Sequence, residues 1–191
     1  MKKILIGTHN RGKFNEIAHL ISKKYIKIAP YKLKIISPKE TGKTFSSNSR
    51  LKAKYFAKYV NYAVISDDSG LCIKSLNNMP GIYSARLAKR HGGFYNAMRL
   101  ILKRLKNKKD RSATFVCSLT FINAKKKVTN VIGKISGKIS KRILGKNGFG
   151  YDPIFIPDKK DITFAQMPKS KKIKIDHRYI AFRKLKRKIN I

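Results

Sequence analysis

Two of the chain's nine carboxylates are adjacent, at Asp67 and Asp68. They follow the apolar residues of 63–66 and precede Ser69 and Gly70, which predicts that both side chains lie at the end of a β-strand. Two like charges there would repel each other unless a cation lay between them. In a chain of formal charge +37, this pair indicates a divalent-metal site, which Glu40 could join. The alternative is a turn with two solvated acidic residues.

A second motif lies at the first predicted strand-to-helix junction. Residues 7–13 fit the G-x-x-x-x-G-K part of a phosphate loop, but Phe14 stands where that loop has Ser or Thr to bind magnesium. The missing hydroxyl argues strongly against a true phosphate loop. The junction still offers the unpaired N–H groups of a helix N-terminus together with Lys13, a combination that binds phosphate. The alternative is an ordinary strand-to-helix turn in which Asn10 caps the helix.

Two later segments could contact a planar ligand. Gly148 and Gly150 flank Phe149, so the backbone could approach a ligand while the ring stacks on a base. A tight turn with one buried aromatic residue explains that segment equally well. Near the C-terminus, Lys172 and the pair His177-Arg178 could donate hydrogen bonds to a purine edge, and a basic helix cap is the alternative.

Hydrophobic spacing predicts the elements that position these residues. Helices are expected over residues 13–21, 47–59, 94–105 and 177–189, and strands over 3–7, 33–37, 63–68, 113–122 and 127–136. Residues 77–81 are expected to form a loop. Strands that alternate with helices indicate the α/β class, and the hairpin formed by the last two strands indicates a mixed sheet.

The composition limits the class of protein. With 191 residues and 42% hydrophobic residues, the chain is expected to fold as a single globular domain, residues 1–191. No segment has the length of a membrane span, and the apolar N-terminal run is too short for a signal peptide. Cys72 and Cys117 lie in apolar strand-like runs and are expected to be buried thiols rather than a disulfide or metal ligands, which favours the cytoplasm.

The positive charge admits a second class of function, a nucleic-acid-binding module. The 46 Lys and Arg residues, however, are spread over nearly every segment instead of forming one basic arm or face. This distribution favours a general compositional bias over specific nucleic-acid binding. The charge would still attract polyanions of any kind, including nucleoside triphosphates.

Taken together, the motifs resemble the Ham1/RdgB inosine triphosphate pyrophosphatase family over essentially the whole chain. The resemblance rests on Thr8-x-Asn10-x-x-Lys13, Glu40-Thr-Gly-x-Thr-Phe45 with Asn48 and Lys52-Ala53, Ser66-Asp-Asp-Ser-Gly-Leu71, Pro80-Gly-Ile-Tyr-Ser-Ala-Arg86, Gly148-Phe-Gly-Tyr-Asp-Pro153, and Lys172 with His177-Arg178. The order and spacing of these segments match the family.

The resemblance implies a magnesium-dependent enzyme that cleaves nucleoside triphosphates between the α and β phosphates. The expected substrates are the deaminated purine nucleotides ITP, dITP and XTP, which the enzyme would remove from the nucleotide pool. A relative that acts on pyrimidine triphosphates is the alternative within this architecture. The implied fold is an elongated mixed β-sheet flanked by helices, with two lobes and an active-site cleft between them, and the implied assembly is a homodimer.

The resemblance also implies a role for individual residues. Asp68 would be the catalytic acid-base residue and, with Glu40, a ligand of Mg²⁺, while Asp67 is an optional further ligand. The residues expected to bind the substrate fall into a phosphate group and a base group: Thr8, His9, Asn10, Arg11, Gly12, Lys13 and Ser69 in the first, and Phe149, Gly150, Tyr151, Asp152, Lys172, His177 and Arg178 in the second.

The chain departs from the family pattern at several positions near this predicted site. Lys39 and Ser47 stand where the family usually has acidic residues, and His9 and Asp176 stand where it usually has Gly and Ser. Lys39 and Ser47 remove negative charge close to the predicted metal, which leaves the number of metal ions and their affinity open.

Overall fold

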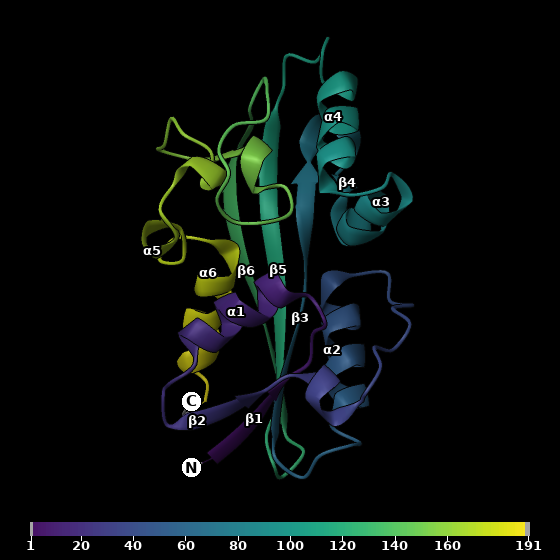
Figure 1. Ribbon diagram of the computed structural model, residues 1–191, viewed down its shortest axis with the longest axis vertical. Helices are drawn as coiled ribbons and strands as arrows, with labels where there is room; N and C mark the ends of the chain where they lie inside the picture. The colour runs from purple at the N-terminus through teal and green to yellow at the C-terminus, as the bar shows by residue number, and fades with distance from the viewer. Residues whose placement is uncertain (1, 190–191) are drawn as a thin grey trace. The chain divides into compact units, whose positions relative to one another are not determined.

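The structure is a computed structural model that describes residues 2–189 (Figure 1). The strands are β1 (Lys2–Ile6), β2 (Tyr25–Ile28), β3 (Ala63–Ile73), β4 (Met79–Pro80), β5 (Ser112–Ile122), β6 (Val128–Ile139) and β7 (Phe155–Pro157). The helices are α1 (Arg11–Leu20), α2 (Phe45–Phe56), α3 (Ser84–Arg90), α4 (Phe94–Arg104), α5 (Lys169–Lys172) and α6 (His177–Lys186). None of the helices within residues 2–189 is long and apolar enough to span a membrane.

The strands form one mixed sheet in the order β2-β1-β3-β5-β6-β7, with β4 paired to β3. β1 is parallel to both β2 and β3, whereas β4 is antiparallel to β3 and β7 is antiparallel to β6. Helices flank this sheet, so the predicted α/β class with a mixed sheet is confirmed.

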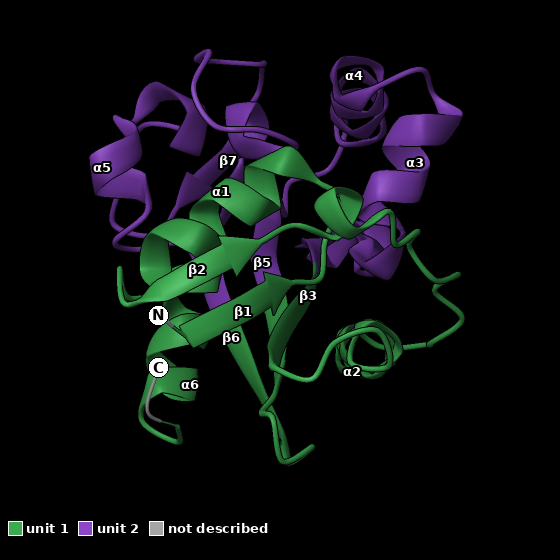
Figure 2. Ribbon diagram, turned by 60° about the horizontal axis from the view of Figure 1, so that its bottom comes forward, with its two compact units in different colours: residues 1–68, 117–133, 178–191 green, residues 69–116, 134–177 purple. Residues whose placement is uncertain are grey.

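The chain divides into two compact units, coloured separately in Figure 2. Unit 1 comprises residues 1–68, 117–133 and 178–191, and unit 2 comprises residues 69–116 and 134–177. β3, β5 and β6 contribute residues to both units. The expectation of a single domain over residues 1–191 stays a prediction.

Unit 1 has a separate hydrophobic core on each face of its strands, as strand alternation requires. The first, here called the α1–α6 core, contains Ile4, Ile6, Ile17, Ile65, Cys117, Leu119, Ala181, Phe182 and Leu185. The second, here called the α2 core, contains Leu5, Ala53, Phe56, Ala57, Val64 and Ile122. In the unit 1 parts of β3 and β5, odd-numbered residues therefore face α1 and α6, and even-numbered ones face α2.

Unit 2 packs α3 and α4 on its part of the sheet around a single core. Its fully buried members include Leu71, Ile73, Leu105, Phe155 and Phe164. Arg111 is fixed beside this core, because its guanidinium donates to the backbone carbonyls of Leu105, Ile139 and Ser140.

Two expectations about the strands were wrong. The strand expected at 33–37 lies earlier, at β2, because Pro30 starts a 3-10 helix that ends at Leu33 and Lys34 has a φ of 54°. The strand expected to end at Asp68 continues to Ile73. Gly70 signalled a turn, but it lies within β3, where glycine is required because a Cβ would collide with the backbone carbonyl of Gly81.

The helices agree better with the sequence. The expected helices at 13–21, 47–59, 94–105 and 177–189 correspond to α1, α2, α4 and α6, with ends that differ by a few residues. The sequence analysis did not predict α3 or α5, and part of the loop expected at 77–81 is the two-residue strand β4.

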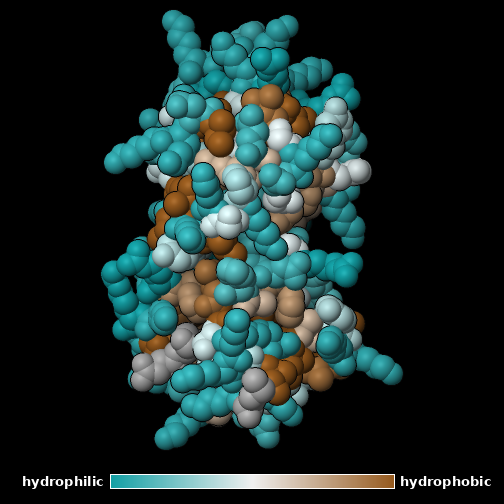
Figure 3. All heavy atoms as spheres, turned by 60° about the vertical axis from the view of Figure 1, so that its left-hand side comes forward, coloured by the Kyte–Doolittle hydropathy of each residue, from teal (hydrophilic) through white to brown (hydrophobic). Residues whose placement is uncertain are grey.

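The charged surface and Cys117 follow the sequence. On the face shown in Figure 3, hydrophilic side chains are spread over the whole surface with smaller hydrophobic areas between them. Cys117 is fully buried, as predicted, whereas Cys72 is only half-buried.

Candidate functional site

The adjacent aspartates of β3 point to opposite faces of the sheet. Successive side chains of a strand alternate, so Asp67 lies on the side of the α1–α6 core with Ile65, and Asp68 lies on the side of the α2 core with Val64. β3 continues to Ile73, so the expectation that both lie at a strand end is wrong, and the alternation argues against a cation held between the two carboxylates. The two carboxylates have different hydrogen-bond and ion-pair partners, although the charges of Lys13 and Lys52 act on both of them.

Asp67 is paired with two cations of the chain. Its carboxylate is fully buried and lies 3.1 Å from Lys13 Nζ and 3.7 Å from Arg178 Nε. Arg178 Nη1 also donates to Glu16 Oε2 at 2.5 Å, so an ion-pair chain joins α1, β3 and α6. Burial alone would raise the pKa of Asp67, but the positive charges of Lys13 and Arg178 hold that pKa well below its usual range. Asp67 therefore serves to position Lys13, which argues against its optional role as a metal ligand.

Asp68 has the opposite electrostatic environment. It is only 4% exposed and accepts a hydrogen bond from Asn48 Nδ2 at 3.1 Å. The amide of Gly42 donates to Asn48 Oδ1 at 2.8 Å, which fixes the orientation of the Asn48 side chain. Burial raises the pKa of Asp68, and the nearby positive charge of Lys52 only partly offsets this effect. A carboxyl group with a raised pKa is better suited to accept a proton near neutral pH.

Lys52 of α2 links Asp68 to the predicted metal ligand Glu40. Its Nζ lies 2.5 Å from Glu40 Oε1, and the pair is mostly buried. Burial alone would lower the pKa of Lys52, but the surrounding aspartates and Glu40 raise it. Asn48 and Lys52 belong to a sequence motif, but no local pattern predicts their role, because their partners lie 20 and 12 residues away in the chain.

The carboxylates on the α2 side fit a magnesium ion that is completed by other oxygens. Within residues 2–189, no group of three or more His, Cys, Asp and Glu side chains is placed to hold a metal ion. Mg²⁺ commonly takes only one or two carboxylates, with water and substrate phosphates as its remaining ligands. The charge of Glu40 also raises the pKa of Asp68, so these two carboxylates are close enough to repel each other. A divalent cation would relieve that repulsion.

The junction between β1 and α1 is the strand-to-helix turn that the sequence predicted. Asn10 caps α1, since its Oδ1 accepts from the amide of Lys13 at 3.0 Å, and Thr8 Oγ1 accepts from the amide of Asn10 at 3.2 Å. His9 Nδ1 lies 2.6 Å from Ser37 Oγ, which ties the turn to the segment that leads to Glu40. The first amides of α1, from Arg11 and Gly12, have no partner within the helix by geometry and can bind an anion.

Ser47, which departs from the family pattern, has a structural role here. Thr44 Oγ1 accepts from the amide of Ser47 at 3.0 Å, and Ser47 Oγ accepts from the amide of Thr44 at 3.0 Å. The two residues thus form a reciprocal capping box that starts α2. A serine at this position keeps the helix start and adds no negative charge.

Unit 2 holds the residues that were expected to contact the base. Lys172 Nζ donates to Asp152 Oδ2 at 2.6 Å, and both side chains are almost fully buried. The same ammonium lies 5.0 Å from the centroid of the Phe149 ring, and the amide of Phe149 donates to Asp152 Oδ2 at 2.9 Å. Gly148 has a φ of 75°, and a Cβ there would collide with the Asp152 carboxylate. The half-buried Phe149 is therefore held by a charged pair beneath its loop.

The other predicted base-site residues have different surroundings. Tyr151 is 2% exposed, belongs to the core of unit 2 and donates from its hydroxyl to the carbonyl of Ser84 at 3.0 Å. His177 stacks on Phe115 with ring centroids 4.8 Å apart and an interplanar angle of 8°. Gly150 has a φ of 68°, and Ser69 is the half-buried residue that follows Asp68 in β3. Their direct contact with a substrate stays a prediction.

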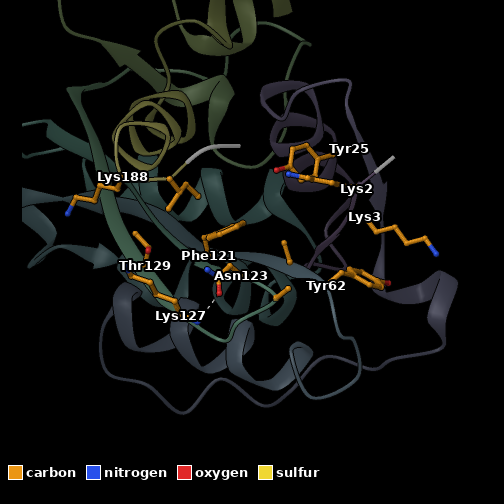
Figure 4. A pocket seen from close by; sticks show the side chains of 12 residues that line it. Lys2, Lys3, Tyr25, Tyr62, Phe121, Asn123, Lys127, Thr129 and Lys188 are labelled. Atoms are coloured by element: carbon orange, nitrogen blue, oxygen red, sulfur yellow. Dashed lines mark hydrogen bonds between the residues drawn. The ribbon is translucent and has the colours of Figure 1, made fainter.

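Two hollows of unit 1 lie outside both groups of site residues. One, of about 630 Å³, has aromatic walls from Tyr25, Tyr62 and Phe121, with lysines such as Lys127 and Lys188 around it (Figure 4). The other, of about 740 Å³, is lined by residues that include Leu33 and Tyr59. None of the predicted site residues lines either hollow. Lysines at the rim identify no ligand, because a chain with 46 Lys and Arg places basic residues around most surface features.

Known proteins of one family are similar to the chain over nearly its whole length. A sequence model described as the Ham1 family matches residues 4–188. A dITP/XTP pyrophosphatase from Dictyoglomus thermophilum is 39% identical over 96% of this chain and 92% of its own. The solved structure of the Staphylococcus aureus Ham1 protein has a TM-score of 0.86 and 38% identity, covering 97% of each chain. A Ham1 protein from Coxiella burnetii has a TM-score of 0.87 and 32% identity, covering 97% of this chain and 96% of that one.

Proposed function

The chain belongs to the Ham1 family, and from this we propose that it is a nucleoside triphosphate pyrophosphatase. Its substrates are the deaminated purine nucleotides ITP, dITP and XTP, which it hydrolyses to the monophosphate and pyrophosphate. This activity removes them from the nucleotide pool before they enter nucleic acid. The observation that carries the proposal is the meeting of the Lys13-bearing helix start with the Asp67-Asp68 strand, at 3.1 Å between Lys13 Nζ and Asp67.

Charge neutralisation is the first task of such a site. A triphosphate repels an incoming water molecule until its oxygens are neutralised. The N-terminus of α1 offers backbone N–H groups and the positive end of the helix dipole to these oxygens. Lys13, held in place by Asp67, adds a positive charge beside them. Both groups stabilise the negative charge that develops on the departing pyrophosphate.

Asp68 is the group that orients and deprotonates the attacking water. Asn48 donates to one of its oxygens, Oδ2, and thereby fixes the plane of the carboxyl group. The raised pKa of Asp68 makes it a stronger base than an exposed aspartate, and a positioned base of this kind contributes about 10²- to 10⁴-fold to the rate. Lys52 balances the charges of Asp68 and Glu40 while no substrate is bound.

We assign Mg²⁺ to the α2 side of β3, where Asp68 and Glu40 would hold it. When bound, the ion supplies Lewis-acid stabilisation of the phosphate oxygens. Asp67 takes no part in holding it, because it faces the α1–α6 core and is paired with Lys13 and Arg178.

Base recognition is assigned to unit 2. Phe149 offers a ring face for stacking, and Lys172 offers an ammonium with three N–H donors, one of them directed to Asp152. Donors aimed at a 6-oxo group would meet the 6-amino group of adenine instead and stay unsatisfied, at a cost of about 1–3 kcal/mol each. This cost disfavours ATP. Arg178, whose guanidinium is bound to Glu16, supports the site through Asp67.

We further propose that the enzyme works as a cytoplasmic homodimer, as the family resemblance implies. Light scattering coupled to size-exclusion chromatography tests the assembly, and a monomer at micromolar concentration would contradict it.

The activity is tested by pyrophosphate release from a panel of triphosphates in the presence of Mg²⁺. ITP, dITP and XTP should be hydrolysed, and ATP, UTP and dTTP should be poor substrates. A preference for UTP or dTTP would contradict the base assignment. A salt titration of binding to random duplex DNA tests the competing class, because strong DNA binding without pyrophosphate release would identify a nucleic-acid-binding module.

A further inference from the structure

A cluster of polar side chains lies between α2 and the β5–β6 hairpin, outside the residues that the proposed chemistry uses. It consists of Ser46 and Ser49 of α2, Ser118 and Thr120 of β5, and Asn130 of β6. Ser49, Ser118 and Thr120 are fully buried. The two β5 residues are even-numbered, so they share a sheet face with Asp68 and with the α2 core. Five polar residues at a helix-on-sheet contact require a reason, because apolar residues would pack there without needing hydrogen bonds.

Asn130 is the centre of this cluster. Its Nδ2 lies 2.8 Å from Thr120 Oγ1, 2.9 Å from Ser118 Oγ and 3.1 Å from the carbonyl of Leu119. It also lies 3.3 Å from Ser49 Oγ, and Ser46 Oγ donates to Asn130 Oδ1 at 3.1 Å. One side-chain amide therefore binds β5 on one side and two successive turns of α2 on the other.

Hydroxyl contacts strengthen the same connection. Ser49 Oγ lies 2.9 Å from both Ser118 Oγ and Thr120 Oγ1. An amide group carries only two hydrogens, so the four acceptors around Asn130 Nδ2 share them, and the hydroxyl groups rotate to complete the network. Such a network is satisfied in one arrangement of helix and strand, and any sliding of α2 would break several bonds at once.

The orientation of α2 matters because this helix carries the residues that bind the side chains of Asp68 and Glu40. Asn48 donates to Asp68, and Lys52 donates to Glu40. A shift of α2 by one residue would turn these side chains by about 100° around the helix axis. The apolar contacts of Ala53 and Phe56 in the α2 core are not directional and would resist that rotation only weakly. The hydrogen bonds of Asn130 are directional.

We propose that Asn130 is a positioning residue that fixes the rotation of α2 and thereby holds Asn48 against Asp68 and Lys52 against Glu40. The proposal rests on the proposed function for its kinetic consequences, but the positioning itself can be measured without any activity. Asn130 touches no reacting atom and acts only through the serines of α2.

The test compares Asn130→Leu, which keeps the size of the side chain and loses its hydrogen bonds, with Asn130→Ser, which is shorter but supplies one hydroxyl group that can still form hydrogen bonds. Asn123→Ala, in the turn of the same hairpin, is the matched control, because Asn123 Oδ1 accepts from the amide of Lys127 and takes no part in the network. The readouts are hydrogen–deuterium exchange over residues 45–56, calorimetric binding of Mg²⁺ alone, and kcat and KM for ITP per folded molecule.

The proposal predicts faster exchange over residues 45–56 and weaker Mg²⁺ binding in Asn130→Leu. It also predicts a kcat lowered by about 10- to 10²-fold with KM changed much less, since small displacements of catalytic groups have effects of this size. Asn130→Ser should be intermediate, and Asn123→Ala should keep the wild-type kcat even where the hairpin is less stable. A lower melting temperature with unchanged exchange in α2 and unchanged kcat would overturn the proposal. If Asn130→Leu does not fold, Asn130→Ser decides by the same criteria. Wild-type protein that does not hydrolyse ITP would refute the proposed function, but hydrogen–deuterium exchange over residues 45–56 would still test whether Asn130 positions α2.

Discussion

Replacing Asp67 by asparagine is expected to destabilise the fold strongly, whereas the same replacement at Asp68 is expected to abolish activity without destabilising it. Asp67 is fully buried between Lys13 at 3.1 Å and Arg178 at 3.7 Å. Removing one partner of a buried ion pair costs about 3–5 kcal/mol, because the remaining charges stay buried without compensation. For a protein of this length, that loss lowers the melting temperature by about 6–20 °C.

Asp68 should respond in the opposite way. Burial disfavours its charged form, so the neutral Asp68→Asn side chain removes a cost and should leave the free energy of unfolding unchanged or higher. Pyrophosphate release should fall by at least about 10²-fold, because the base that activates water is gone.

The pH dependence of stability separates the two residues further. The pKa of Asp67 is lowered in the folded protein, so its contribution is fully present above the ordinary value of 3.8 and is lost as the pH falls through the folded value. The stability difference between wild type and Asp67→Asn should therefore be constant near pH 7 and shrink only in acid. For Asp68 the pKa is raised, so its ionisation costs stability as the pH rises above 3.8.

The assays are urea denaturation followed by far-UV circular dichroism between pH 3 and pH 8 and, for folded protein, pyrophosphate release from ITP. The two variants are matched controls for each other, since they change neighbouring residues of one strand by the same chemical step. Unfolding of Asp67→Asn within about 1 kcal/mol of wild type would refute the proposed role of the ion-pair chain. Near-normal turnover by Asp68→Asn would show that another group is the base.

The remaining predictions concern Gly42, which lies beside Asn48, and the residues Phe149 and Asp152 of the predicted base site. Gly42→Ala should lower kcat for ITP about 10-fold while the protein stays folded, because the new methyl group would collide with the side chains of Ser47 and Asn48 and displace Asn48; an unchanged kcat would contradict this. Phe149→Ala should mainly raise KM in steady-state kinetics, since stacking acts before as well as during the reaction, and an unaltered KM would rule out stacking. Asp152→Asn should destabilise the protein by about 3–5 kcal/mol in urea titrations, because it leaves the ammonium of Lys172 buried without a counter-charge. A loss below about 1 kcal/mol would show that another group compensates that charge.

The sequence by itself determined the fold class, the positions of the helices α1, α2, α4 and α6, and the identity of the motifs. Hydrophobic spacing located α1, α2, α4 and α6, and the capping role of Asn10 followed from its place before α1. These features are local, since each depends on residues within a few positions of one another. The family resemblance, which rests on the order of short motifs, was likewise available from the chain alone and is confirmed by the comparisons.

Only the tertiary structure decided how the acidic residues are used. Gly70 was interpreted as a turn signal, whereas it is needed for the close approach of Gly81 within β3, a strand whose alternation places Asp67 and Asp68 on opposite faces. The ion-pair chain that compensates Asp67 and the Asn130 network that orients α2 both join distant residues. Within the ion-pair chain, Arg178 and Glu16 are 162 positions apart. No local pattern encodes such pairings, because they arise when the packing of helices on a sheet brings distant residues within hydrogen-bond distance.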